Sequence, residues 1–126
     1  MIEIRKKDAI ELTKAFLQDL KNENLEALQK YGVDYNVLQE IKETLASCEW
    51  PLSDLEMPPV EKALSGETDG GREIFELFLL DDPEVMGIDM CFLDKTGEDI
   101  GLTLSAEIIR QDDGQLQLQY RLLEVQ

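Results

Sequence analysis

The side chains in this sequence that could carry out chemistry are mostly carboxylates. Asp and Glu number 28 against 12 Lys and Arg, and there is no histidine. A Ser-His or Cys-His nucleophile pair therefore cannot be built, and a general base would have to be a carboxylate, lysine, tyrosine or cysteine. Cys48 and Cys91 lie far apart and outside any Cys-x-x-Cys motif, so we expect two small buried apolar residues and no zinc site or disulfide framework. The sequence predicts no catalytic residue, no metal site and no cofactor.

Two carboxylate groups have a second interpretation. Asp89 falls among the apolar residues of a strand-like run. A low-dielectric position there would favour its protonated form, whereas the alternative is an exposed Asp on the solvent face of a strand. The group Asp81, Asp82 and Glu84 could hold a hard cation, but it lacks the Asp-x-Asp-x-Asp-Gly spacing of a calcium loop. Solvated turn charges are the stronger interpretation of that group.

The run Asp94-Lys95-Thr96-Gly97 resembles the phosphorylated-aspartate motif of P-type ATPases over four residues. The sequence departs from that motif at the fifth position, and such pumps need membrane helices and a nucleotide domain. Asp-Lys-Thr-Gly is also an ordinary hairpin turn, with glycine available for a positive φ angle. We therefore predict a turn at this place.

Acidic residues are concentrated in the second part of the chain. Residues 1–48 carry nine Asp/Glu and seven Lys/Arg, a net charge of −2, whereas residues 49–126 carry nineteen and five, a net charge of −14. Such a field attracts basic partners and repels nucleic acid, anionic membranes and acidic metabolites. Basic residues cluster only at Arg5-Lys6-Lys7. We predict that a basic protein binds acidic side chains of one connector and two turns: Glu67, Asp69, Asp81, Asp82, Glu84, Asp94, Glu98 and Asp99.

The N-terminal residues are charged from the third position and lack the apolar run of about 7 to 15 residues of a signal peptide. The later apolar stretches, residues 77–80 and 90–93, are too short to span a bilayer. We therefore expect a cytoplasmic protein that does not bind membranes. At this length, with 43% apolar residues, residues 1–126 are expected to form one α+β domain.

Helical periodicity marks the first part of the chain. Apolar residues recur at three- and four-residue intervals over residues 9–20 and again over residues 25–31. Asp8, with a Glu three residues later, has the spacing of a helix start, and Gly32 is placed as a C-terminal stop. Asp34 can cap a third helix, which must end before the first proline of the chain.

A connector and four strand-like runs follow the helices. The connector, residues 50–71, is rich in Pro and Gly, and only residues 60–64 could make one helical turn in it. The runs are separated by short acidic loops, which join antiparallel neighbours, and they cover residues 72–80, 85–93, 100–110 and 115–125. The fold class predicted is α+β, with two or three N-terminal helices packed on a four-stranded antiparallel meander sheet.

The alternation within the runs assigns their faces. The last two runs place one set of apolar residues on a packed face, and we expect it to bury against Leu12, Phe16, Leu20 and Ile41. That set is Ile100, Leu102, Leu104, Ala106 and Ile108 in one run and Leu116, Leu118, Tyr120 and Leu122 in the next. The opposite face, with Thr103, Ser105 and Glu107, is expected to be polar. The run 72–80 is apolar on both sides, so we expect it to lie under cover.

This layout is similar to the cystatin-like and nuclear-transport-factor-like cone folds. Together with its size, its acidity and the absence of a signal, the chain looks like the immunity proteins of bacterial polymorphic-toxin and contact-dependent-inhibition systems. The resemblance implies a cytoplasmic inhibitor that binds a basic toxin domain, often a nuclease, and blocks its active site. It carries no functional residue over, because the sequence holds no diagnostic family motif.

Two other function classes stay open. One is a small-molecule binder or enzyme that uses the interior of a cone, with Asp89, Cys91 and Tyr120 as its polar residues. The other is a structural or regulatory domain whose acidity only secures solubility. The position of the acids separates the three classes, since a contiguous acidic surface, an inward carboxylate in a pocket and scattered charge would each favour a different one.

Overall fold

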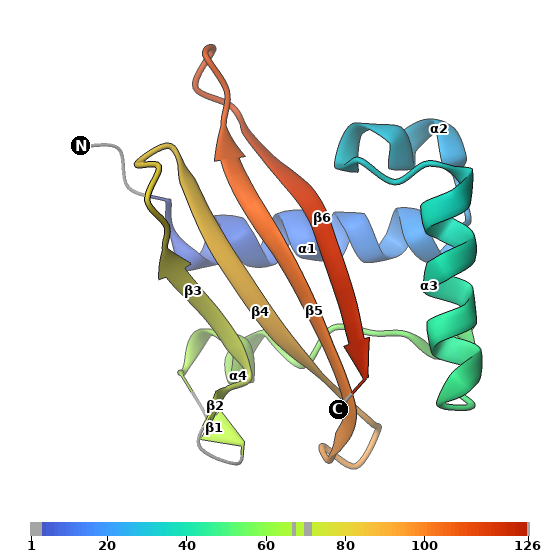
Figure 1. Cartoon of the computed structure of the whole chain (residues 1–126). Helices are drawn as coiled ribbons and strands as arrows, with labels where there is room; N and C mark the ends of the chain where they lie inside the picture. The colour runs from blue at the N-terminus through green and yellow to red at the C-terminus, as the bar shows by residue number, and fades with distance from the viewer. Residues whose placement is uncertain (1–3, 67, 70–71, 126) are drawn as a thin grey trace.

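The computed structural model describes residues 4–66, 68–69 and 72–125, without the side chains of residues 68, 69 and 72. Helices occupy the first half of the chain and strands the second (Figure 1). The helices are α1 (Lys6–Lys21), α2 (Leu25–Leu28), η1 (Gln29–Tyr31), α3 (Tyr35–Ser47), η2 (Leu52–Asp54) and α4 (Val60–Leu64), where η marks a 3₁₀ helix.

Two of the predicted helix ends are confirmed and one is wrong. Asp34 caps α3 as predicted, since its Oδ1 accepts a hydrogen bond from Val37 N at 2.9 Å. Gly32 ends η1 in the left-handed conformation at φ +81°. The predicted start of α1 at Asp8 is wrong, because the helix begins at Lys6. Asp8 lies in its first turn, with Oδ2 3.1 Å from Arg5 Nε. A carboxylate in this turn interacts favourably with the positive end of the helix dipole.

The strands form the predicted meander. β3 (Phe75–Leu79), β4 (Val85–Leu93), β5 (Asp99–Arg110) and β6 (Leu116–Val125) pair in chain order, each antiparallel to the next. The fold class is therefore α+β, as predicted. The first run is divided, because β2 (Arg72–Glu73) pairs with β1 (Thr68–Asp69) in a separate small hairpin ahead of β3.

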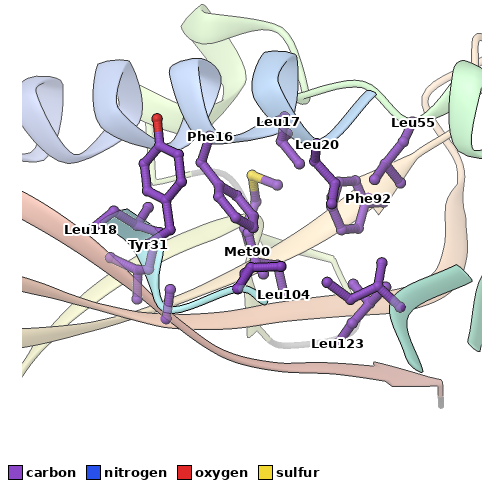
Figure 2. Close-up of a cluster of buried hydrophobic side chains, with 14 of the residues drawn as sticks. Phe16, Leu17, Leu20, Tyr31, Leu55, Met90, Phe92, Leu104, Leu118 and Leu123 are labelled. Carbon is purple, nitrogen blue, oxygen red and sulfur yellow. The ribbon is translucent and has the colours of Figure 1, made fainter. Parts of the chain in front are cut away.

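The core lies between α1 and one face of the sheet (Figure 2). Leu102, Leu104 and Leu118 are fully buried there, as the alternation predicted, and so are three of the four predicted partners on the helices, Phe16, Leu20 and Ile41. Phe16 of α1 is central: its ring meets Tyr31 edge-on at 5.0 Å and stacks on Tyr120 at 5.9 Å. The core residues Leu12, Ile100, Leu116 and Tyr120 are partly buried.

One residue of the predicted packed face lies on the other side of the sheet. Leu122 is 50% exposed and Leu123 is buried in its place. The cause is a β-bulge: Ser105 pairs with Leu122 and Ala106 with Tyr120, so Arg121 is an extra residue in β6 and the alternation reverses after it.

The prediction that the first strand lies under cover is wrong at its C-terminal end. β3 is an edge strand, and although Phe75 is buried, Leu79 is 83% exposed and Leu80 just beyond it is also exposed. The face of the sheet that was expected to be polar contains a buried residue. Thr103 is buried next to its cross-strand neighbour Cys91, which is buried as predicted.

Candidate functional site

The two predicted acidic turns lie at opposite ends of the sheet (Figure 1). Asp81, Asp82 and Glu84 belong to the β3–β4 turn, whereas Asp94 and Glu98 belong to the β4–β5 turn and Asp99 is the first residue of β5. Two successive turns of a meander cannot share an end, so the two groups do not form one contiguous patch. The backbone of Asp69 lies in β1, its side chain is outside the description, and Glu67 lies outside the described residues.

The β3–β4 end gains acids that the sequence did not assign to it. Asp112 and Asp113 lie in the β5–β6 turn at this same end, and the two turns meet where Arg110 N donates to Glu84 O at 2.9 Å. Arg110 Nε also lies 3.7 Å from a Glu84 carboxylate oxygen. Asp81, Asp82 and Glu84 are all exposed, so these acids form a solvated surface on two turns.

The β4–β5 turn is organised by Asp94. The oxygen Oδ1 of Asp94 accepts hydrogen bonds from Thr96 N at 2.8 Å, from Thr96 Oγ1 at 2.6 Å and from Glu98 N at 3.0 Å. Gly97 takes φ +90° and donates to the Asp94 carbonyl at 3.0 Å, so the predicted turn is confirmed. The hydrogen bond from Thr96 Oγ1 and those from the backbone lower the pKa of the Asp94 carboxyl.

This pKa shift predicts how the turn responds to acid. Because the folded-state pKa of Asp94 is lowered, its hydrogen bonds stabilise the turn above the unfolded-state pKa and are lost as the pH falls through the folded-state value. We expect the amide proton shifts of Thr96 and Glu98 to move together with the Asp94 carboxyl shift in an NMR titration. In the control Asp94→Asn, which keeps a neutral acceptor, these amide shifts should no longer titrate. Wild-type amide shifts that stay constant through the carboxyl titration would contradict this prediction.

A concave surface adjoins this turn, and we call it the connector groove. It has a volume of about 700 Å³ and lies between the connector and the β4–β5 turn. Its apolar wall comes from Trp50, Met57, Pro58, Pro59 and Leu93, and its polar wall from Asp54, Glu56, Asp94, Lys95 and Thr96. The connector is held in place by Leu55, which is 1% exposed and packs in the core (Figure 2).

The charges around the connector groove are unequal. Three carboxylates line it, Asp54, Glu56 and Asp94, against the single ammonium of Lys95. Glu56 has one distant partner, Lys21 Nζ at 4.0 Å, and its side chain stays 70% exposed. The indole N–H of Trp50 is shielded from solvent and has no acceptor among the described residues. The groove therefore offers apolar surface and exposed carboxylates in a small space.

The sequence pointed to one wall of this groove and missed the other. Asp94 was among the predicted residues, and Glu98 and Asp99 follow it in the same turn. The sequence pattern assigns Trp50, Asp54 and the residues up to Pro59 only to a connector. The signal that could have found them is the single tryptophan of the chain close to three of its four prolines, an unusual amount of rigid apolar surface for a linker.

The residues proposed for a pocket in the sheet do not converge. Tyr120 faces the core, where it stacks on Phe16, and burial raises the pKa of its hydroxyl to about 12. Asp89 and Cys91 alternate with the buried Ile88 and Met90, so they point to the opposite face. Asp89 is half-buried there and accepts a hydrogen bond from Ser105 Oγ at 2.8 Å.

Over the described part of the chain, no group of three or more Cys, Asp or Glu side chains is placed to hold a metal ion. None of the helices found there is long and apolar enough to cross a membrane. Comparisons of the chain with protein-family models, curated proteins and solved structures found no match.

Proposed function

We propose that this protein is a non-enzymatic, cytoplasmic inhibitor that binds a basic protein, such as the toxin domain that an immunity protein neutralises. The observation that carries the proposal is the connector groove, where exposed carboxylates surround an apolar wall. Basic side chains fit both parts, because Arg and Lys place an aliphatic stem on apolar surface and keep a charged head at carboxylates. The charge of −14 on residues 49–126 would steer such a partner toward the protein.

The groove is a better binding surface than the acids at the other end of the sheet. Charge at exposed turns changes mainly the association rate, whereas the residues that hold a complex together are desolvated in concave, apolar places. Trp50 gives the groove an aromatic face for a guanidinium. We therefore assign the partner contact to Asp54, Glu56 and Asp94 around Trp50, and long-range steering to the remaining acids.

Matched charge reversals test this assignment. Asp54→Lys with Glu56→Lys changes the groove, and Asp81→Lys with Asp112→Lys changes the net charge by the same amount at the opposite end. The partner in this assay is the protein encoded by the neighbouring gene. Its binding is measured by stopped flow over a salt series. We expect the groove pair to raise the dissociation rate at least about tenfold, or about 1.4 kcal/mol. The distal pair should lower only the association rate.

Salt and biological readouts complete the test. Association with wild type should slow markedly above about 0.15 M salt, where the screening length falls to about 8 Å. Cells that produce the partner should survive with wild type and lose protection with the groove pair. Binding rates that change neither with salt nor with the groove reversals would reject the proposal, and the acidity would then serve solubility alone.

A further inference from the structure

The free edge of the sheet at β3 is unlike the free edge at β6. Natural edge strands are protected by covering elements, bulges, prolines or charges, because an open row of backbone groups invites another strand. β6 has such protection: it is contacted by α3 and η1, Gln117 donates to the Lys30 carbonyl, and it contains the bulge at Arg121. β3 reads Phe-Glu-Leu-Phe-Leu, pairs in regular register with β4, and has no other strand partner among the described residues.

The hydrogen-bond phase of β3 tells which backbone groups face outward. Cys91 N donates to Ile74 O at 2.9 Å, so the residues of even number in this segment bond to β4. The N–H and C=O groups of Phe75, Leu77 and Leu79 therefore point away from the sheet. Beside them lies a groove of about 1020 Å³, lined by Ile4, Leu77, Leu79 and Met86 and bordered by Arg5 and Lys6.

We propose that β3 pairs with β3 of a second copy of this chain, which makes a two-fold symmetric dimer with one continuous eight-stranded sheet. A two-fold axis makes the pairing antiparallel. The register centred on Leu77 uses all three outward-facing residues: Leu77 meets its own copy and Phe75 meets Leu79 of the second copy. In this register the 83% exposed Leu79 is covered beside Phe75, toward the apolar groove. This dimer is independent of the function proposed above.

The charges beside this edge are mixed, which matches a second copy better than a partner strand of one charge. Arg5 and Lys6 border the groove together with the acids Glu73 and Asp81. In the dimer, the register places Asp81 of the second copy opposite Glu73, whose carboxylate lies 3.6 Å from Lys6 Nζ. Arg5 is paired with Asp8 at 3.1 Å and Lys6 with Glu73, so Asp81 of the second copy approaches two ion pairs of zero net charge, although each chain carries −16.

The test is the mass of the full chain in solution, measured by light scattering and sedimentation over a concentration series. Wild type should approach twice 14.4 kDa. Leu79→Lys should raise the dimer dissociation constant at least about tenfold, and Leu79→Pro should do the same because its missing N–H faces outward and is not needed by β4. The matched control Leu122→Lys, at the 50% exposed position on β6, should leave the dimer intact. Circular dichroism establishes that each variant is folded.

A cross-link tests the register. Leu77→Cys should form a disulfide between its own copies on oxidation, because Cα atoms of a hydrogen-bonded pair are about 5.5 Å apart. Leu122→Cys should not, and mass spectrometry of the linked peptide separates these bonds from Cys48 and Cys91. A wild-type mass of 14.4 kDa at every concentration, a dimer unaffected by Leu79→Lys, or equal cross-linking at Leu122→Cys would each overturn the proposal.

Discussion

Replacing Leu104 with alanine is expected to lower the free energy of unfolding by about 2 to 5 kcal/mol. Leu104 lies in the middle of β5, is 1% exposed, and has Met90 and Leu123 as cross-strand neighbours (Figure 2). The loss combines the transfer of the removed methyl groups with the cavity that remains, because both adjacent strands are fixed by the ladder. Urea denaturation with a two-state fit measures it.

The matched control for Leu104→Ala is Leu122→Ala in the neighbouring strand. Leu122 is 50% exposed after the bulge, so its truncation should change the free energy of unfolding by no more than about 0.5 kcal/mol. A loss below about 1 kcal/mol for Leu104, or a larger loss for Leu122 than for Leu104, would mean that the faces of the sheet are assigned the wrong way round.

Phe16→Ala is expected to cost about 3 to 5 kcal/mol, the largest loss in the core. Phe16 is fully buried on α1 and contacts rings from two other elements, Tyr31 of η1 and Tyr120 of β6. Its removal leaves a cavity where the helix, the sheet and the segment after α2 meet. Urea denaturation is again the measurement, with circular dichroism to establish that the variant is folded.

A double-mutant cycle separates the ring contact from the burial of Phe16. We expect Phe16→Ala and Tyr31→Leu to be coupled by about 0.5 to 1.5 kcal/mol, since edge-to-face ring pairs contribute beyond their buried area. Tyr31 also donates a hydrogen bond to Asp19 at 2.8 Å, so Tyr31→Phe is the control that removes only the hydroxyl. The pair Phe16→Ala and Tyr35→Ala, with Tyr35 62% exposed, should show no coupling. Equal coupling in both pairs would exclude a specific ring contact.

Features that depend on a few adjacent residues could be predicted from the sequence. The cap at Asp34, the stop at Gly32 and the turn at Asp94 each follow from the hydrogen bonds or φ angle of one short segment. The meander follows from loops too short for a crossover. The same short loops explain why the two acidic turns lie at opposite ends of the sheet.

Features that depend on distant pairing could not be predicted. The bulge in β6 exists only relative to β5, so the alternation of Leu116 to Leu122 gave no sign of it. The exposure of β3 depends on strand order, and an edge strand apolar on both faces has the same pattern as a central one. The connector groove needs the docking of Trp50 and Met57 beside the β4–β5 turn, which no local pattern encodes.

The bulge also fixes where the chain can lose a residue. Tyr120 and Leu123 both face the core, with two residues between them in place of the single residue of a regular strand. Deleting Arg121 would restore simple alternation and keep both core residues inward, whereas deleting Gln119 would turn Tyr120 outward unless the bulge moved. β6 thus contains one residue more than its pairing with β5 needs. A one-residue deletion in this strand should therefore disturb the core least at position 121.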